Sequence, residues 1–582
     1  MDIQAIDVNS WLNSNEVENL QQVQNNWNKI PLLNVQNPQD LQVNKLVRFK
    51  GMIQDMFNPE YYYETYEVVN KETKEKHVLP GKYRDTAVCD DKEYINFESK
   101  SNVTKDRQTF VLITAPGFND WAINAEEQFH HPNKVIEAPA VSTSTKRSMN
   151  DEDEQPETTS MEVDSTTACS KKQCTNSNNP ETENKSVVSV DHLLNMPLPG
   201  RSGKACHLKV YEKADNLKLN ELIDCVGFLS MEGLYQEGAN DGDDNEDETL
   251  MELQTHHPPP SLIPKIHCIA FKQVVDSSPL YEESNNMSGQ ELQTIKKELE
   301  IVLTQLLLGD KLAAEYLIYH LISKVYNRFD LMVLGKFTYN ISNVPTCILS
   351  EYGAQVYAIL EKLITKSHYL PMTLDNMNDL AFIPKKDYDC NRITSGILQL
   401  SSNTHLVLDE TKLTTGKMNS SGVQAVGAIS EIIKNQRSHY DFNYYKMDFD
   451  CDIAFLILSE GKSLLPSDVH VPLRPEDAHI TTFEEILAAL NVYLKPELLT
   501  SIRKYIANRR HAVYEITDNI HEVVQNEFVN MRANQNATAE DLHSLLVLSR
   551  FICLADGKSV LDESCWRRAC QLEQERKARL QN

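Results

Sequence analysis

The sequence predicts a chain of mixed class, in which a β-rich amino-terminal part is followed by an α/β part and then by helices alone. Three observations predict this order. Short strand-like runs recur up to residue 274, helical and strand-like runs alternate from about residue 288, and the residues from Thr481 onward read as helices only. Strands that alternate with helices are typical of a parallel sheet covered by helices. The 582 residues correspond to three or four domains of ~150 residues each.

The β-rich part begins with a predicted helix that Asp7 or Asn9 can cap. Its apolar face is formed by Trp11, Leu12, Val17 and Leu20. Strands follow at Leu46–Met56, Glu64–Asn70, Phe110–Pro116, Cys206–Glu212, Ile223–Glu232 and Lys265–Val274. In the first of these strands, apolar and polar residues alternate as in a half-buried strand.

Short strands that contain glycine, at Gly51 and Gly227, favour a small curled β-barrel of the OB-like type. A generic β-sandwich is the alternative. OB-like barrels often bind oligonucleotides, but these strands carry few paired aromatic and basic positions. The sequence therefore does not by itself predict nucleic-acid binding.

The α/β part is predicted from two kinds of apolar run, one with the spacing of a helix and one with that of a strand. Helices are expected at 288–307, 311–326, 352–366, near 391–400 and near 423–436, and strands near Met332–Tyr339, at His405–Asp409 and at Asp452–Ser459.

The chain is acidic, with 84 Asp and Glu against 57 Lys and Arg and a formal charge of -27. This excess argues against a protein whose main task is to grip phosphate backbones. About half of it lies in two stretches: residues 151–188 hold nine acids and three bases, and residues 236–252 hold eight acids and no base. The polar linker 138–198 is predicted to be disordered, and an acidic insert at 236–258 interrupts the strands.

Two interpretations of the acidic stretches stay open. They either steer the chain toward basic surfaces of partners or only increase solubility. If deletion of 236–252 leaves affinity and association rate unchanged at low salt, steering is excluded.

Several classes are excluded or not expected. There is no run of ~18 apolar residues, so no membrane-spanning helix is predicted. The amino-terminal residues lack the basic start and apolar core of a secretory signal. The twelve cysteines form no CxxC pair, so reduced thiols are expected and no metal site is predicted.

The segment Leu306–Ile322 has the outline of a phosphate-binding loop, because an apolar run ends in Gly309-Asp310 and an apolar helix follows. A working loop needs a Lys for the terminal phosphates and a Ser or Thr for Mg²⁺. Glu315 and Tyr316 stand at those two positions. A carboxylate repels a triphosphate, and a tyrosine is too large for the hydroxyl position.

A second acidic motif ends the strand His405–Asp409. Asp409-Glu410 fits a Walker B element, in which Asp acts on the metal and Glu polarises water, although many structural strands also end in acids. The sequence Gly461-Lys462-Ser463 resembles the end of a phosphate loop, but Leu456 occupies the position of the required partner glycine. We interpret that match as coincidence.

Five segments together resemble the family of minichromosome maintenance (MCM) complex-binding proteins. They are Leu46–Tyr62, Leu306–Ser323, Phe382–Thr411, Ser459–Asp468 and Ala539–Leu561. The resemblance covers nearly the whole chain except the two polar inserts. Since that family is similar to the MCM helicase subunits, it implies an OB-like β domain (an amino-terminal region 1–137, continued at 199–285), a degenerate AAA+-like α/β domain at 286–480 and a lid-like helical domain at 481–582.

The helicase resemblance extends to the nucleotide-site motifs, several positions of which are changed. Gly309, Asp310 and Ala314 match the helicase phosphate loop, whereas Glu315 and Tyr316 replace its Lys and Ser.

Downstream, Asp409 and Glu410 match the helicase Walker B pair, Ser459 or Glu460 stands near the sensor asparagine, and Glu540 replaces the sensor arginine. The resemblance therefore implies no catalytic residue, no bound cofactor and no ATP hydrolysis.

The function implied by the resemblance is non-catalytic binding of MCM helicase subunits during DNA replication. The family promotes unloading of the complex from chromatin and assembly or stability of its subunits, and supports sister chromatid cohesion and cell-cycle progression. The resemblance also implies a nuclear location, together with a cytoplasmic pool. It implies that the chain associates with DNA through chromatin-bound MCM and does not bind a membrane. The rival hypotheses are an active ATPase or helicase and an OB-type nucleic-acid-binding replication factor.

Overall fold

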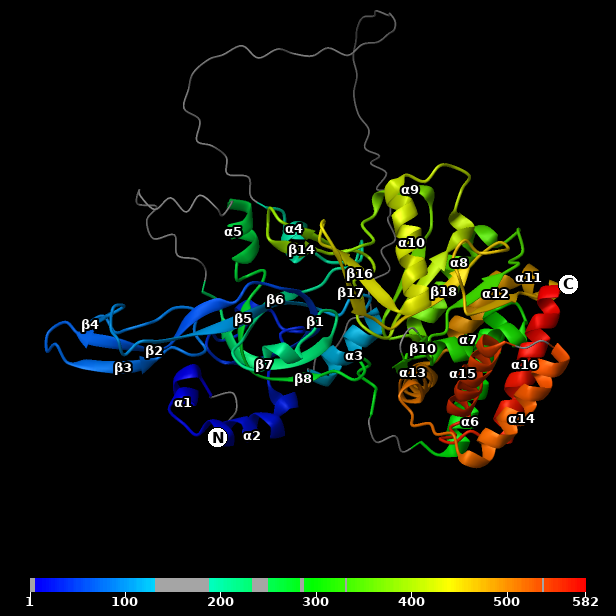
Figure 1. Cartoon of the computed structure of the whole chain (residues 1–582), viewed down its shortest axis with the longest axis horizontal. Helices are drawn as coiled ribbons and strands as arrows, with labels where there is room; N and C mark the ends of the chain where they lie inside the picture. Colours follow the sequence, from blue (N-terminus) through cyan, green and yellow to red (C-terminus); the bar gives the residue numbers. More distant parts are fainter. Residues whose placement is uncertain are drawn as a thin grey trace, which may run out of the picture.

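The computed structural model describes residues 6–130, 188–232, 250–282, 287–329, 332–535 and 538–581. A sheet-rich amino-terminal half and an α/β half lie next to each other, and the carboxyl-terminal helices lie at the end of the molecule that is opposite to the sheet-rich half (Figure 1). Of the two predicted polar inserts, residues 138–187 and 236–249 lie outside the described residues. The remainder is ordered, against the prediction: α4 (Val190–Leu194) and α5 (Leu250–His256) are helices, and Leu198 is buried.

Five strands of the amino-terminal half form a closed circuit of pairings, which we call the ring of strands or, in short, the ring. They are β1 (Leu46–Met56), β5 (Val103–Ile113), β6 (Ala205–Val210), β7 (Leu222–Ser230) and β8 (Lys265–Gln273). β1 pairs antiparallel with both β5 and β7, β5 pairs with β6, β6 runs parallel to β8, and β8 returns to β7. All five strands were predicted, four of them to within two residues at each end, whereas β5 begins seven residues before the predicted Phe110.

The two glycines of this ring are required by close approach of backbone. A Cβ on Gly51 would lie 2.5 Å from the carbonyl oxygen of Ile113, and one on Gly227 would lie 2.2 Å from that of His267. The prediction that these glycines accompany curling of the sheet therefore has a steric reason. The interior is filled by apolar side chains, among them Phe49, Ile53, Phe110, Leu112, Leu208, Ile223 and Ile266.

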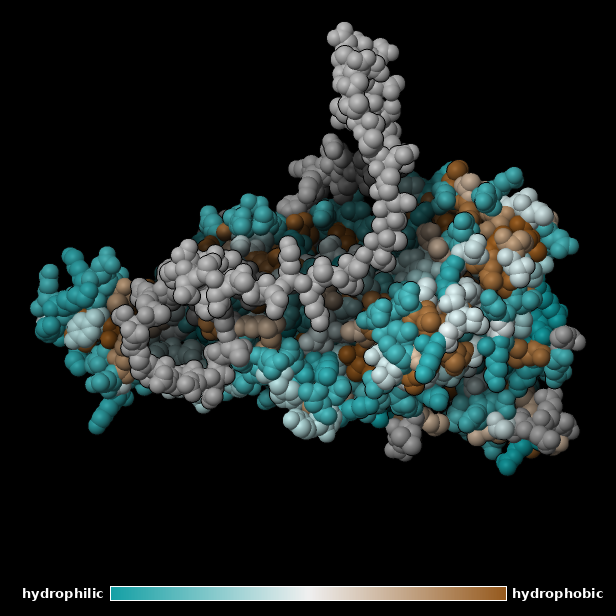
Figure 2. Space-filling model, turned by 90° about the horizontal axis from the view of Figure 1, so that it is seen from above, coloured by the Kyte–Doolittle hydropathy of each residue, from teal (hydrophilic) through white to brown (hydrophobic). Residues whose placement is uncertain are grey.

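The predicted strand Glu64–Asn70 belongs to a longer strand, β2 (Glu60–Asn70), which forms an arm with β3 (Lys76–Pro80) and β4 (Glu93–Ile95). The tip of this arm is mainly hydrophilic in Figure 2.

The predicted first helix is two helices, α1 (Val8–Leu12) and α2 (Glu16–Asn25), which cover the outside of the ring. Asp7 caps α1, as predicted, but Val17 is 64% exposed and does not belong to the buried face. A further helix, α3 (Asp120–His130), follows β5.

The α/β half contains the predicted parallel sheet. Its strands lie in the order β12 (Ser367–Pro371), β15 (Thr404–Asp409), β18 (Ile453–Leu458), β11 (Tyr339–Ser342) and β19 (Val469–Pro472), and all run parallel. One face packs on α9 (Leu374–Asp379) and α10 (Ser420–Asn435). The other face packs on α6 (Gly289–Leu306), α7 (Lys311–Leu321) and α8 (Leu349–Leu363).

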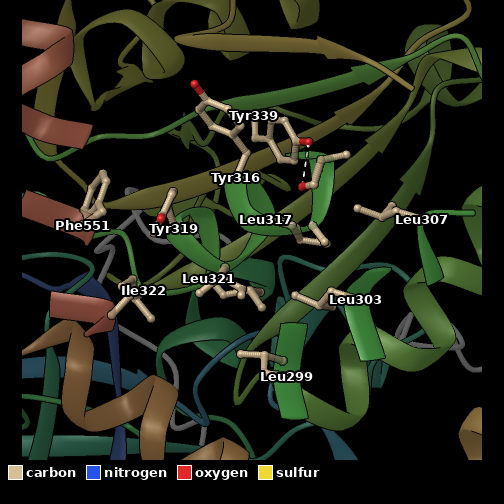
Figure 3. Close-up of a cluster of buried hydrophobic side chains, with 14 of the residues drawn as sticks. Leu299, Leu303, Leu307, Tyr316, Leu317, Tyr319, Leu321, Ile322, Tyr339 and Phe551 are labelled. Carbon is tan, nitrogen blue, oxygen red and sulfur yellow. Dashed lines mark hydrogen bonds between the residues drawn. The ribbon is translucent and has the colours of Figure 1, made fainter. Parts of the chain in front are cut away.

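The residues from Thr481 onward form helices, as predicted. After α11 (Asp477–Thr481) come α12 (Phe483–Tyr493), α13 (Pro496–Arg510), α14 (Asp518–Gln535), α15 (Ala539–Ala555) and α16 (Glu563–Gln581). Their buried residues and those of α6–α8 form one hydrophobic core (Figure 3). Residue 480, the predicted boundary of a lid, therefore does not separate two cores. In the part of the chain that is described, no helix is both long and apolar enough to span a membrane.

Two predictions in the α/β half are wrong. The segment near 391–400 is not a helix: it begins with β14 (Arg392–Thr394), and its next amides bond to the distant carbonyls of Ala381 and Phe382. The predicted strand Met332–Tyr339 is split between β10 (Met332–Leu334), which pairs with β9 (Asn327–Phe329), and β11, because Gly335 turns the chain at φ +96°.

β14 belongs to a second sheet of four strands, with β13 (Lys385–Asp387), β16 (Arg437–Asp441) and β17 (Lys446–Asp450). This sheet lies between the ring and the parallel sheet in Figure 1. Tyr440 of β16 donates its hydroxyl to Asn220 at 2.7 Å, and Asp55 of β1 accepts the N–H of Ile393 at 2.6 Å. The two halves are therefore joined by buried hydrogen bonds.

Buried neutral histidines predict an acid-sensitive fold. Burial lowers the pKa of His207 to about 3 and those of His320 and His368 to about 4. Their folded pKa values lie below the unfolded value, so the unfolded state binds more protons as pH falls below about 6.5, and stability falls with it. Asp55 and Glu410, whose pKa values are raised by burial, act in the opposite sense.

We expect the urea midpoint to fall between pH 7 and pH 5, with each histidine contributing up to ~1.4 kcal/mol per pH unit. His320→Asn should reduce this slope while keeping a donor for the carbonyl of Phe337, which the ring contacts at 2.9 Å. If the midpoint of His320→Asn changes between pH 7 and pH 5 as much as that of the unchanged chain, His320 does not contribute to the acid sensitivity.

Candidate functional site at the carboxyl edge of the parallel sheet

The predicted phosphate-loop residues form a turn between two helices. Leu308 and Gly309 have left-handed φ values of 59° and 87°, the N–H of Gly309 bonds to the carbonyl of Thr304 at 2.8 Å, and Asp310 caps α7. A phosphate loop connects a strand to a helix, whereas α6 precedes this turn. The helix predicted at 288–307 is confirmed as α6, and the turn at Gly309-Asp310 therefore lacks the strand that a phosphate loop requires.

Asp310 lies beside the exit of β19 and has its own cation. Arg579 of α16 contacts both carboxylate oxygens, at 2.5 and 3.0 Å, and the N–H groups of Ala313 and Arg474 donate at 3.1 and 2.9 Å. The carboxylate is only 1% exposed. Because four donors surround two oxygens, the carboxylate has little capacity left for a metal or its water shell.

Ala314, Glu315 and Tyr316 follow along α7, where Ala314 and Tyr316 are buried and Glu315 is partly buried. Ala314 is buried in the core. Glu315 accepts two bonds from Arg568 of α16, at 3.2 and 2.5 Å, and one from the hydroxyl of Tyr319 at 2.7 Å. A second pair with α16 therefore holds the acid that stands at the predicted lysine position.

Tyr316 is part of the central aromatic cluster shown in Figure 3. Its ring is stacked with those of Phe337 and Tyr339, at centroid distances of 6.4 and 6.3 Å, and is fully buried. Burial raises the pKa of its hydroxyl far above the usual range. Tyr339 in turn donates to the carbonyl of Ala313 at 3.0 Å, which fixes α7 on β11.

Asp409 ends β15 under α8. It accepts bonds from the hydroxyls of Tyr369 and Thr411, at 2.6 and 2.5 Å, and from the N–H of Thr411 at 3.1 Å. A Cβ on Gly353 of α8 would lie 2.3 Å from its Oδ2. Asp409 thus lies against the backbone of α8, as expected of a structural strand end.

Glu410 is held by the loop that follows β18. Ser463 donates its hydroxyl to Oε1 at 2.6 Å, and the N–H groups of Leu464 and Leu465 donate at 3.2 and 3.3 Å. Burial raises the pKa of Glu410, and these three donors reduce the shift. Ser463 belongs to the Gly-Lys-Ser sequence that we interpreted as coincidence, and it serves here as a partner for Glu410.

The predicted motifs do not converge on one point. Asp310 lies by β19 and Asp409 ends β15, three strand positions away, which corresponds to about 14 Å at the usual strand spacing. Between them the hydroxyl of Ser459 lies 2.9 Å from Oδ1 of Asn340, at the ends of β18 and β11. In open α/β sheets, ligands bind outside this carboxyl edge, where the strand order reverses. Here that point lies between β11 and β18.

Glu540 lies near the amino ends of the parallel strands, away from the carboxyl edge that holds Asp310 and Asp409. It is exposed in the first turn of α15, where a negative charge is favourable. Together with Tyr316, Lys336 and Arg576, it lines a cavity of about 700 Å³ by the start of β19. A side chain placed there does not reach Asp409.

The arginines of α16 are the site residues that the sequence interpretation missed. Arg568, Arg576 and Arg579 pair with Glu315, Glu573 and Asp310 respectively. Their spacing of eight and three residues places them on one helical face, which is the signal that was available. Within the described ranges, no group of three or more His, Cys, Asp or Glu side chains could hold a metal ion.

The outer face of the ring carries a second polar cluster. On β6, Leu208 points into the ring, whereas Lys209 points outward. Lys209 contacts Glu60 at 2.8 Å and Asp85 at 3.0 Å, and Arg107 contacts Glu60 at 3.1 Å.

These contacts lower the pKa values of both acids. Burial alone would raise the pKa of Asp85, but His267, Lys209 and Lys265 hold it well below its usual value. Lys209 and Arg107 lower the pKa of Glu60 to about 2 against the same effect of burial. Each of the basic groups Arg107, Lys209 and Lys265 therefore already has a carboxylate partner.

Comparison with known proteins gives matches along almost the whole chain. A family model described as "Mini-chromosome maintenance replisome factor" matches residues 17–580. Relatives named "Mini-chromosome maintenance complex-binding protein" include those of Drosophila melanogaster, 39% identical over 96% of this chain and 93% of the relative, and of Homo sapiens, 39% identical over 95% and 91%. The relative from Gallus gallus is also 39% identical, over 96% and 91%.

Proposed function

The chain belongs to the family of mini-chromosome maintenance complex-binding proteins, and from this we propose that it binds subunits of the MCM complex in DNA replication without acting as an enzyme. The proposed partner rests on the family model, which matches residues 17–580, and on the 39% identity with relatives of that name over almost the whole chain. Unloading of the complex, stability of its subunits, sister chromatid cohesion and cell-cycle progression are the finer roles that we propose with it, as is a nuclear location.

We infer that the α/β half is a degenerate AAA+-like domain. This is supported by the five parallel strands with helices on both faces and by the acidic pair that ends β15. A domain of this kind can offer a partner the lateral surface of a helicase subunit. Asp310 is paired with Arg579 and Glu410 with the Ser463 loop, so the chain itself holds the acids of both predicted motifs.

A purified chain is therefore expected to show no ATP turnover above a blank containing no protein. Glu410→Gln should not change that result, because the proposed role of Glu410 is to hold the loop after β18. Release of phosphate from ATP should be measured with an active ATPase as positive control. Turnover that disappears in Glu410→Gln would support the rival hypothesis of an active enzyme.

We infer that the closed circuit of five strands is an OB-like barrel. The rival function that follows is nucleic-acid binding, since such barrels use an outer strand face for oligonucleotides. The face formed by β5, β6 and β8 argues against it, because Arg107 and Lys209 are paired with Glu60 and Asp85. DNA association is then indirect, through chromatin-bound MCM.

Salt dependence separates these functions. An oligonucleotide-binding barrel would lose affinity steeply as salt is raised, by a factor set by the number of phosphates that it contacts. We expect the full chain to show only weak binding of single-stranded DNA at low salt.

The experiment that tests the proposal directly is affinity purification of the tagged chain from cells of its own source, followed by mass spectrometry. MCM subunits are expected in near-stoichiometric amounts. Their absence, with the tagged chain recovered in folded form, would overturn the proposed function.

A further inference from the structure

Two turns of the four-stranded sheet expose a compact group of large side chains. Tyr388 lies between β13 and β14, and the turn between β16 and β17 holds Phe442, Tyr444 and Tyr445, with Met447 just beyond. Tyr444 is 90% exposed, Tyr445 55%, Tyr388 49% and Met447 42%. We call these five residues the aromatic turn patch.

The patch is held in one arrangement. The hydroxyl of Tyr388 donates to the carbonyl of Phe442 at 3.0 Å and so connects the two turns. The rings of Phe442 and Tyr445 are stacked at 5.1 Å with an angle of 2°, and those of Tyr388 and Tyr444 meet edge to face at 6.2 Å.

The backbone of the second turn is fixed in the same way. Asn443 takes a left-handed φ of 62°, and its N–H bonds to Oδ1 of Asp441 at 2.9 Å. An exposed group that is already ordered loses little entropy when a partner binds.

The fold does not require these side chains to be apolar. The same hairpin already packs on the closed circuit of strands through the buried Tyr440, which precedes the turn by two residues. Its hydroxyl bonds to Asn220, and its aromatic ring lies 4.6 Å from that of Phe449. The turn projects beyond this last packing contact. Its aromatic side chains therefore contribute exposed apolar surface rather than core, and grouped surface of this kind marks an interaction site.

The charges around the patch favour a protein as the partner. In register, Asp441 lies opposite both Lys385 and Lys446, and Asp387 follows on β13, so both signs alternate along the edge. A phosphate backbone requires a positive track, which is absent from these described strands. An aromatic centre with a mixed polar rim is the composition of protein interfaces.

We propose that the aromatic turn patch anchors the chain to a folded protein partner that offers an apolar pocket with a rim of mixed charge. This rests on the proposed function, in which the partner is a subunit of the MCM complex. Tyrosine rings at the centre of such a contact bury large areas, and their hydroxyl groups remain available for hydrogen bonds.

The test uses the full chain and recombinant MCM subunits, individually and as subcomplexes. The double variant Tyr444→Ser with Tyr445→Ser is expected to weaken binding about tenfold or more. Tyr61→Ser is the matched control, because Tyr61 on the β-arm is also 85% exposed. It should bind like the unchanged chain. Equal thermal midpoints for all three proteins would establish that the double variant is folded.

The outcomes separate the two proposals. If the unchanged chain binds a subunit and the double variant binds equally well, the patch is not the anchor, whereas the proposed function stands. If the unchanged chain binds no subunit, the proposed function fails and the patch proposal fails with it.

Two further results would assign the patch to another occupant and overturn the proposal. One is self-association in sedimentation that is lost in the double variant, and the other is binding of single-stranded DNA that is lost in the same way. As a second positive readout, a photo-crosslinking amino acid placed at position 444 should capture a peptide of the subunit.

Discussion

Arg579→Ala is expected to lower the free energy of unfolding of the α/β half by about 3–5 kcal/mol, the usual cost of leaving a buried charge without its partner. Asp310 would keep the N–H groups of Ala313 and Arg474 but lose both contacts from the guanidinium, at 2.5 and 3.0 Å. Its carboxylate is 1% exposed, so water cannot replace the arginine without local opening. Urea denaturation measures the loss, and hydrogen exchange on α16 locates it.

The control is Arg567→Ala on the same helix. Arg567 is 68% exposed and pairs with Glu563 in the preceding turn, so its removal should change stability by less than about 0.5 kcal/mol. The double variant Asp310→Asn with Arg579→Met removes both charges and should recover part of the loss. If Arg579→Ala is as stable as the unchanged chain, the pair does not hold α16 in place.

Asp85→Ala is expected to cost a similar amount, about 3–5 kcal/mol, in the β-rich half. Asp85 contacts Lys209 at 3.0 Å, Lys265 at 3.8 Å and the hydroxyl of Ser230 at 2.6 Å. Without it, two buried ammonium groups share only the charge of Glu60, which Arg107 also contacts. Urea denaturation followed by hydrogen exchange on β6 and β8 measures this effect separately from that on α16.

Glu212→Ala is the matched control for the ring. Glu212 is 72% exposed and pairs with Lys82 at 2.9 Å, and an exposed pair of this kind contributes at most about 1 kcal/mol. A cost for Asp85→Ala no larger than that for Glu212→Ala would mean that the cluster is solvated in solution.

Most strands could be predicted because their signal is local. In β1 and β7, apolar side chains alternate or run continuously over nine to eleven residues, and β15 and β18 are short apolar runs buried on both faces. The parallel arrangement followed from alternation with helices. The segment near 391–400 was predicted wrongly because its amides bond to Ala381 and Phe382, a tertiary contact that overrides local periodicity.

The candidate site was predicted in its residue types and not in its geometry. The sequence interpretation placed Glu315 and Tyr316 at the Lys and Ser positions of a phosphate loop, whereas in the structure both lie on a helix whose preceding turn follows another helix. Their actual neighbours, Arg568 and Phe337, could not be identified from the sequence, because only the packing of the chain brings them beside α7. The sequence shows which chemistry is missing at a position, but not which group has taken its place.

The sequence by itself determined the order of the β-rich and α/β parts, the absence of the lysine and serine that a phosphate loop requires, and the family resemblance that the comparisons bear out. Only the tertiary structure decided that α16 supplies the cations for Glu315 and Asp310, across 253 and 269 residues of chain. The physical reason is that buried charges must be paired wherever packing places them. Local patterns specify helices and strands, whereas the partner of a buried carboxylate depends on which helix the core brings beside it.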